Sequence, residues 1–497
     1  MKNIVITFKM LIIVLLFASC SEDFLDVNDD PNNPTSVSMD LILPVAQSYS
    51  AFMQESEQDG QNRLGNLMMY NWSNSAGFPW YISEFRYNVI PTFYSQIFDY
   101  TYKNTLKQYN ALNDIEGDEY GYYHAISKIM MSYHFQILVD AYGDVPYFEA
   151  LQRGADPTPV YDDAQIIYDD LIVQLTEAID LINATASNSD ISPLTPGSDD
   201  AMFGGNMSLW KKFANTVKLR ILVRQSDMTE RIDYIKNEFA VIAGEGSGFM
   251  SSDIKVQLGY INEENKMNPK WESFGQDSQG NNTQTNRATC ATQYLIVFLT
   301  MTLDSRLDLI YEEPPTGHLG VKQGETDYDY PEPGQWVPEK VSNLGSGILR
   351  GPGQAAVLYT AAESYFNQAE AAMKGLIIGD AKSLYEMGIQ ASFNYLGAGD
   401  AISSYTQNLN LVSWDASPDK LEAIITQKWI AVNSIDAIQS WFDYSRTGFP
   451  ANLPISALAT TSDRPVRLAY PASELTSNGE NLPAQPDVFN TKIFWAN

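Results

Sequence analysis

The residue types that carry out most covalent chemistry are few in this chain, and their spacing is not that of a reaction centre. The 497 residues include three histidines and two cysteines. His124, His134 and His318 form neither a His-Glu-x-x-His pair nor another spacing typical of a metal site. No Gly-x-Ser-x-Gly elbow, Walker loop or Gly-x-Gly-x-x-Gly loop occurs. We therefore expect no catalytic residues and no bound metal.

One cysteine near the amino terminus has the surroundings that lipid attachment requires. Ala18-Ser19-Cys20 resembles a bacterial lipobox, although Phe17 stands where leucine is usual. The apolar run Met10–Ala18 is nine residues long and is too short for a membrane span of about 20 residues. We predict that residues 1–19 are a lipoprotein signal peptide, and that Cys20 carries a diacylglyceryl group and an N-acyl chain such as palmitate. The alternative is an ordinary secretory signal with an incidental cysteine.

Lipidation at Cys20 has consequences for location and for the second cysteine. Two or more acyl chains on one residue anchor a protein stably, where a single chain binds only marginally. The acidic tripeptide Ser21-Glu22-Asp23 resembles the export signal that sends lipoproteins to the cell surface in the Bacteroidota-type outer membrane. The expected location is therefore the outer membrane, facing the cell exterior. Cys290 then lacks a partner, and we predict a free thiol there.

The charge balance limits the partners of the chain. It has 31 Lys and Arg against 61 Asp and Glu, a formal net charge of −30. This surplus repels phosphate backbones and excludes nucleic acid as a partner. A hydrophobic content of 44% with 19% charged residues is typical of a globular chain.

The pattern of apolar residues predicts which elements position these groups. Residues 20–40 are rich in Asp, Asn and Pro and predict an extended, lipidated segment. Residues 41–497 predict a single mainly α-helical domain, with helical periodicity from 40 to 240. The expected helix caps there are Asp162 or Asp163, and Ser208.

Helices are expected again after residue 353. Gly375 and Asp380 separate two helices that pack as an antiparallel pair of tetratricopeptide type, and Gly397 ends the second. Ser417-Pro418-Asp419 is expected to open a further helix, with the proline in its first turn. The stretch from Phe449 onward is proline-rich and predicts coil.

A basic cluster on one predicted helix allows two interpretations. It could bind an anion, or its members could pair with neighbouring carboxylates, which is the more common arrangement. Its residues are Lys211, Lys212, Lys218, Arg220 and Arg224.

Residues 244–352 differ in composition from the helical parts. Gly, Asn, Asp, Ser and Pro dominate them, and one short helix is expected at about 290–302. A stretch this long with little regular structure is usually functional. Sugar rings have apolar faces that stack on Trp and Tyr. The candidate ligand-binding residues are therefore aromatic residues of this region and of an earlier segment: Trp72, Trp80, Tyr81, Trp271 and Trp336. Further aromatic residues expected to be exposed are Tyr260, Phe274, Tyr328 and Tyr330.

A series of motifs runs through most of the chain behind the lipobox. Trp210–Arg220 has the pattern Trp-x-x-x-Ala-Asn-x-x-x-x-Arg, and Ala362–Ala371 is an alanine-rich helix with two glutamates. The other motifs are Asn28–Thr35, Asp140–Tyr147, Tyr385–Ser392, Thr426–Ala431, Arg446–Pro450 and Arg467–Pro471. Their order resembles that of the SusD/RagB family of surface nutrient-binding lipoproteins, in its SusD-like branch. Ser445 stands where that family commonly has a second arginine.

The resemblance implies a mainly α, SusD-like fold in which tetratricopeptide-like helix pairs support a loop-rich face. It also implies a cell-surface protein that binds a nutrient, expected to be an oligosaccharide, and delivers it to a SusC-type TonB-dependent outer-membrane transporter. No catalysis is implied, and no cofactor besides the lipid on Cys20. Glu363 and Glu370 on one helix, with Arg220 and Arg446 from others, are expected to form internal ion pairs.

Two alternatives stay open. The chain could be a peptide-binding member of the same family. It could also be a helical surface glycoside hydrolase, because 61 acidic residues offer many carboxylate pairs.

Overall fold

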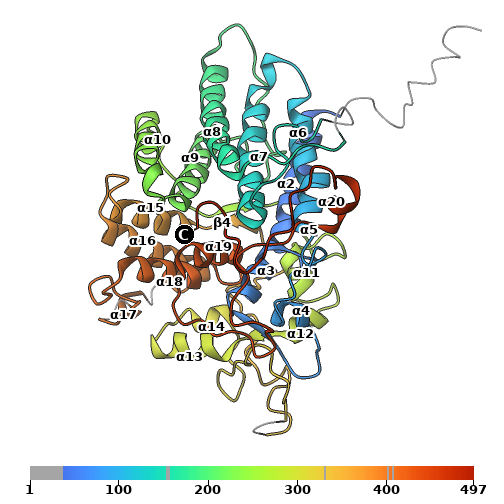
Figure 1. Ribbon diagram of the computed structural model, residues 1–497, viewed down its shortest axis with the longest axis vertical. Coiled ribbons are helices and arrows are strands. Elements are labelled where there is room, and N and C mark those ends of the chain that lie inside the picture. Colours follow the sequence, from blue (N-terminus) through green and yellow to red (C-terminus); the bar gives the residue numbers. More distant parts are fainter. Residues whose placement is uncertain (1–36, 153–156, 330–331, 400–401, 406–407, 497) are drawn as a thin grey trace, which may run out of the picture.

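The computed structural model describes residues 37–152, 157–329, 332–399, 402–405 and 408–496. The predicted signal peptide, Cys20 and most of the segment 20–40 lie outside these residues. Helices dominate the fold, and the strands are short (Figure 1). The elements of the first half of the chain are α2 (Met39–Glu55), α3 (Gln61–Met68), β1 (Trp72–Asn74), α4 (Ile82–Phe85), α5 (Gln96–Tyr100), the π-helical turn η2 (Thr101–Leu106), α6 (Lys107–Asn113), η3 (Asp118–Tyr120), α7 (Gly121–Tyr142), α8 (Ala164–Ser187), α9 (Met207–Arg224), η4 (Thr229–Arg231) and α10 (Ile232–Glu245).

The second half of the chain contains the loop-rich region and a second group of helices. Its elements are β2 (Ile254–Val256), α11 (Pro269–Phe274), α12 (Gln284–Ala288), β3 (Thr289–Ala291), α13 (Gln293–Met301), α14 (Leu307–Ile310), β4 (Ala356–Tyr359), α15 (Ala361–Met373), α16 (Ala381–Leu396), α17 (Ile402–Tyr405), α18 (Lys420–Val432), α19 (Ala437–Thr447) and α20 (Ala472–Ser477). The mainly α fold expected from the sequence is confirmed. None of the described helices is long and apolar enough to cross a membrane.

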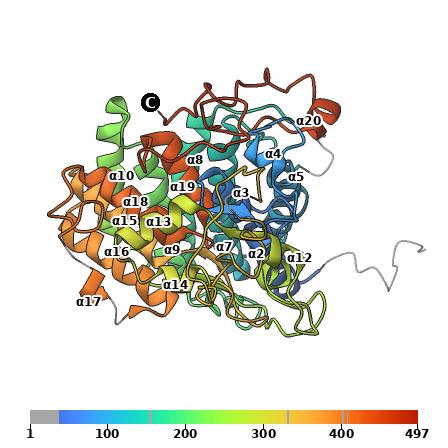
Figure 2. The same cartoon turned by 90° about the horizontal axis from the view of Figure 1, so that it is seen from below.

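The helices form two groups joined through the middle of the molecule. The helices α7, α8, α9 and α10 lie together at the top of Figure 1, and α15, α16 and α18 lie to their lower left. Seen from below, this second group lies opposite α2, α3 and α5 (Figure 2). The loop-rich region, with α11 to α14, occupies the lower end.

Two short antiparallel sheets connect distant parts of the sequence. The strand β1 pairs with β3, with Trp72 opposite Ala291, and β2 pairs with β4, with Ile254 opposite Tyr359. Both strands of each pair are largely buried. The sheets therefore hold the loop-rich region against the helices.

Side-chain caps decide where the helices begin. Asp163 accepts hydrogen bonds from the backbone N–H of Gln165 and Ile166 at the start of α8, and Asp380 caps α16 in the same way, as predicted. Ser208 is not a cap: Asn206 accepts from the N–H groups of residues 208 and 209 and starts α9 two residues earlier.

The expected opening of α18 is also wrong in detail. Asp419 accepts from the N–H of Glu422 and caps the helix, so Pro418 lies before the cap and not in the first turn. Gly397 ends α16 in a left-handed conformation with φ of 87°, as predicted.

The predicted tetratricopeptide-type pair is α15 and α16, which lie side by side in both ribbon views. Gly388 of α16 explains how closely they approach. A Cβ atom at this position would lie only 2.7 Å from the Phe366 ring of α15. A larger residue would therefore separate the two helices.

Buried ion pairs fasten α9 to α15 and to α19, and α15 to α19. The Nε and Nη2 atoms of Arg220 donate to the Glu363 carboxylate at 2.9 Å, and Nη1 and Nη2 of Arg446 donate to Glu370 at 2.7 and 2.8 Å. The predicted internal ion pairs are confirmed. Four of the five residues of the basic cluster pair with carboxylates: Lys211 with Glu245, Lys218 with Glu238, Arg220 with Glu363, and Arg224 with Asp140 and Asp443.

The loop-rich region is more ordered than its composition indicated. The single helix expected at 290–302 begins later, at Gln293, because residues 289–291 form β3. Three further short helices, α11, α12 and α14, lie between residues 244 and 352. The stretch after Phe449 is coil apart from α20, close to the expectation.

Candidate ligand-binding site

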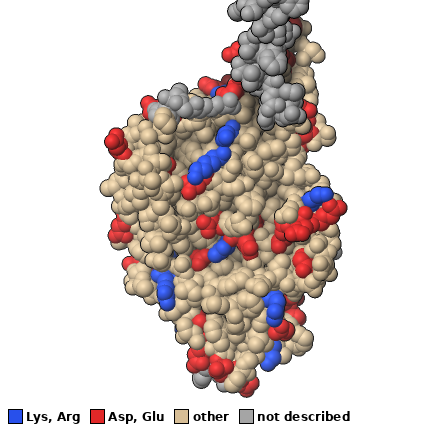
Figure 3. Space-filling model, turned by 90° about the vertical axis from the view of Figure 1, so that its right-hand side faces the viewer, with Lys and Arg blue, Asp and Glu red and all other residues tan. Residues whose placement is uncertain are grey.

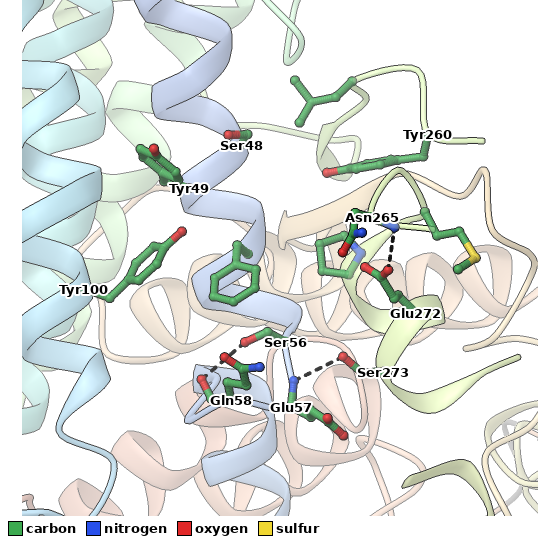
Figure 4. Close-up of a pocket in the computed structure, with 14 residues that line it drawn as sticks. Ser48, Tyr49, Ser56, Glu57, Gln58, Tyr100, Tyr260, Asn265, Glu272 and Ser273 are labelled. Carbon is green, nitrogen blue, oxygen red and sulfur yellow. Dashed lines mark hydrogen bonds between the residues drawn. The ribbon is translucent and has the colours of Figure 1, made fainter. Parts of the chain in front are cut away.

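A pocket of about 470 Å³ opens between α2, α5 and the loop that leads into α11. Figure 4 shows aromatic rings on the helical side and Tyr260 on the facing loop. The lining residues are Ser48, Tyr49, Phe52, Ser56, Glu57, Gln58, Tyr100, Leu258, Tyr260, Asn265, Met267, Pro269, Glu272 and Ser273. The side of the molecule that carries α5, α11 and α12 is mostly uncharged (Figure 3).

Three rings form the aromatic wall of the pocket. The Tyr100 ring stacks on Phe52 with a centroid distance of 5.1 Å and meets Tyr49 edge-on at 5.6 Å. Tyr49 and Phe52 lie three residues apart on α2, and all three rings are partly exposed. Tyr100 directly precedes the π-helical turn Thr101–Leu106. Such turns frequently occur at functional sites.

The opposite wall supplies hydrogen-bonding groups. Glu272 accepts from the backbone N–H of Asn265 at 2.9 Å, and the backbone N–H of Glu57 donates to the Ser273 hydroxyl at 3.3 Å. The Glu57 carboxylate also accepts from the hydroxyl of Thr285. The pocket thus joins ring faces to hydroxyl, amide and carboxylate groups, the combination that binds sugar rings and their hydroxyls.

Two tyrosine hydroxyls at the pocket remain protonated at neutral pH. Burial raises the pKa of Tyr100 to about 12. Burial, and then the Glu55 charge, raise the pKa of Tyr260 well above its ordinary value. Both groups can therefore donate as well as accept hydrogen bonds.

A buried carboxylate fixes the loop wall in place. Glu55, the last residue of α2, accepts from the Asn268 side-chain amide at 2.8 Å and from the Val357 backbone N–H at 3.0 Å. Its Oε1 atom lies 3.2 Å from Lys270 Nζ. Asn268 in turn caps α11 by accepting from the N–H of Trp271 at 3.0 Å. One residue therefore connects α2, α11 and β4 behind the pocket.

Three of the predicted ligand-binding aromatics lie in the core and offer no open ring face. Trp72 is 1% exposed, and its indole N–H donates to the Ser434 hydroxyl at 2.9 Å. Tyr81 is buried, with its hydroxyl 2.6 Å from that of Thr289. Trp336 packs with Cys290 in a small buried cluster.

Trp80 and Trp271 keep part of their surface exposed, but neither lines the pocket. Trp80 meets the Phe78 ring edge-on at 5.7 Å. A ligand contact at these two residues stays a prediction.

The four further aromatic residues that were expected to be exposed also differ in their burial. Tyr260 is half-buried at the pocket and Tyr328 is half-buried elsewhere, whereas Phe274 is buried. Tyr330 lies outside the described residues. Tyr49, Phe52 and Tyr100, which line the pocket, were not among the predicted ligand-binding residues. The available signal was the pair of aromatics at helical spacing on α2, away from its buried stripe.

The histidines and the second cysteine were the residues whose chemistry the sequence analysis considered first. No group of three or more His, Cys, Asp or Glu side chains there could hold a metal ion. Cys290 is a free, fully buried thiol, as predicted. His134 lies 2.8 Å from the Ser50 hydroxyl, but the pair is buried, and burial lowers the pKa of His134 to about 3.

The fold and the pocket together define a helical binding protein with a loop-built recognition face. Comparison with known proteins supplies the family. Residues 31–471 match the SusD-like family, described as starch-binding and associating with the outer membrane, and the chain belongs to this family. No curated protein matches the sequence.

Solved structures show the same fold at low identity. A chitin-binding protein is 23% identical with a TM-score of 0.71, over 91% of this chain and 99% of that one. A chitin-binding SusD homologue from Flavobacterium johnsoniae is 21% identical with a TM-score of 0.73, over 91% and 98%. A SusD homologue from Bacteroides ovatus is 21% identical with a TM-score of 0.72, over 92% and 99%. The family is described by binding, of starch, and two of these neighbours are named for binding chitin.

Proposed function

We propose that this chain is a cell-surface lipoprotein that holds a nutrient oligosaccharide in the pocket beside α2 and passes it to a SusC-type TonB-dependent transporter. The observation that carries the proposal is the pocket itself. It sets Tyr49, Phe52 and Tyr100 opposite Tyr260 and the polar loop of Asn265. The family and its chitin-binding neighbours support a glycan ligand.

Binding of purified protein to chito- and malto-oligosaccharides, measured by titration calorimetry, tests the ligand class. Removing both the Tyr49 and Tyr100 rings (Y49A/Y100A) should weaken binding at least about tenfold, because aromatic residues in the centre of a site carry much of the binding energy. Phe148→Ala is the matched control, since this ring is 51% exposed and does not line the pocket.

The same titrations separate the alternatives. Binding of peptides but not glycans would assign the chain to the peptide-binding members of its family. Release of reducing ends from the oligosaccharide would contradict the non-catalytic function. If Y49A/Y100A bound the oligosaccharide with full affinity, the proposed location of the ligand in this pocket would be contradicted.

The anchor and the transporter require cellular tests. Cys20→Ala should release the protein from outer membranes, because the two-chain lipid anchor is lost. Retention of this variant on membranes would refute lipidation at Cys20. Affinity capture of the wild-type chain from solubilised outer membranes should recover a TonB-dependent barrel, and its absence would contradict the delivery step.

A further inference from the structure

A second hollow, of about 490 Å³, lies on the helix pair α15–α16 and has a different chemistry. Its floor includes Tyr365, Gln390 and Tyr395 from the two helices. Its rim is made by the segment 251–255 at the start of β2 and by Arg350. We call it the cationic hollow.

Two cations of the cationic hollow lie over one aromatic ring. The Arg350 guanidinium is 4.1 Å from the centroid of the Tyr395 ring, and Lys255 Nζ is 5.8 Å from it. Arg350 also donates to the backbone carbonyl of Gly347 at 2.9 Å and to that of Tyr395. These contacts hold the guanidinium in one orientation while its side chain stays exposed.

The carboxylate in the hollow does not balance both cations. Asp253 Oδ2 lies 3.2 Å from Lys255 Nζ, and Asp253 Oδ1 accepts from the backbone N–H of Ala361 at 3.1 Å. Arg350 makes no ion pair with a described carboxylate. The hollow therefore has a local surplus of one positive charge in a chain whose formal net charge is −30.

The first pocket has the opposite character. Its lining includes Glu57 and Glu272 and no Lys or Arg. At physiological ionic strength the Debye length is about 8 Å, so each site presents mainly its own charges to a ligand. The two hollows therefore differ in the charge of the ligand group that each would attract.

One stretch of chain connects the two hollows. Lys255 lines the cationic hollow and Leu258 lines the first pocket. Three residues of nearly extended chain span about 10 Å. The backbone positions that line the two hollows are therefore no more than about 10 Å apart at this point.

We propose that the cationic hollow is a second subsite that binds an anionic group, a carboxylate or a sulfate ester, on the oligosaccharide held in the first pocket. Arg350 donates from Nε and Nη2 to two backbone carbonyls, which leaves its Nη1 atom to donate to either group, and stacking on Tyr395 holds the guanidinium in place. Gln390, Asn394 and the serines of segment 251–252 supply partners for neighbouring hydroxyls. This subsite rests on the proposed glycan-binding function and specifies the charge of the ligand.

The test compares charged and neutral probes of equal length: oligogalacturonate for the carboxylate, chondroitin sulfate oligosaccharides for the sulfate, and chito-oligosaccharide as the neutral probe. The wild type should bind one acidic probe at least about tenfold more tightly than the neutral probe, and added salt should remove this preference. Which acidic probe is preferred identifies the group.

Three variants separate charge from structure. Arg350→Gln and Lys255→Gln should each weaken acidic binding, with Arg350→Gln removing most of the preference, and should leave neutral binding unchanged. Arg350→Lys keeps the charge and should retain much of the preference. Unchanged neutral binding also shows that the variants fold.

The outcomes distinguish the two proposals. Equal affinity of the wild type for acidic and neutral probes would overturn the subsite while leaving the glycan-binding function intact. Loss of neutral and acidic binding together in Arg350→Gln would also overturn it, since the residue would then be structural. A wild type that binds none of the probes, and no malto-oligosaccharide, would refute the proposed function itself.

Discussion

Replacing Glu55 by Gln should destabilise the protein and loosen the ligand pocket together. The change preserves the shape of the side chain but removes the charge that faces Lys270. Lys270 Nζ is 3.2 Å from the carboxylate, and the side chains are 3% and 0% exposed. Breaking a buried pair by removing one partner costs about 3–5 kcal/mol, because the remaining charge stays buried. We expect about 3 kcal/mol, since the amide oxygen can still accept from Asn268 or Val357.

Urea denaturation, monitored by tryptophan fluorescence, measures this loss in the free energy of unfolding. The matched control is Glu263→Gln in the loop before α11, whose partner Lys266 is 62% exposed and whose own side chain is 57% exposed. That pair should contribute less than about 0.5 kcal/mol. The double variant E55Q/K270M should cost less than the two single changes added together, because it leaves neither charge buried.

The E55Q variant should also weaken ligand binding. Asn268 and Lys270, which Glu55 holds, lie between Asn265 and Glu272, two residues that line the pocket. Oligosaccharide affinity should therefore fall in E55Q and remain near wild type in E263Q. A loss of stability below about 1 kcal/mol in E55Q, or additive costs in the double variant, would refute the role assigned to this carboxylate.

Three further predictions concern buried titratable groups. Burial opposes ionisation of Glu370, but the charges of Arg446 and Lys374 outweigh it and lower its pKa from 4.5 to about 2. Its stabilising contribution, about 3 kcal/mol, should be present above pH 4.5 and lost as the pH falls toward 2, so melting curves of Glu370→Gln should converge with the wild type in acid. Burial, and then the Glu363 charge, raise the pKa of Asp436 from 3.8 to about 7, so stability should decrease as the pH rises through this range, and Asp436→Asn should raise the Tm at pH 8 but not at pH 5. Burial raises the pKa of the Cys290 thiol, so thiol reagents should modify it only when the chain unfolds.

The parts of the fold that depend on local sequence were predictable. The cap at Asp163, the glycine end at Gly397 and the α15–α16 pair follow from neighbouring residues, and the structure has all three. The caps at Asn206 and Asp419 were missed by one or two residues because several nearby side chains could accept the same amide bonds.

The candidate site was less predictable because burial depends on distant parts of the chain. Trp72 resembles a ligand platform in sequence, but the pairing of β1 with β3 places it beside Ser434, inside the core. Tyr49 and Tyr100 belong to ordinary helices, and only the arrival of the loop at Tyr260 makes their exposed edges into a pocket wall. The helical spacing of Tyr49 and Phe52 indicates a shared face of α2, but no local pattern shows which distant segment will cover an aromatic residue.

The separation of the pocket walls along the chain also bears on biogenesis. The residues Ser48 to Tyr100 are synthesised well before Leu258 to Ser273, and Val357, which donates to the Glu55 carboxylate, follows later still. Contacts over such sequence distances form late in folding. A chain that ends before Leu258 therefore lacks one wall of the pocket, and a chain that ends before Val357 lacks one partner of the Glu55 carboxylate.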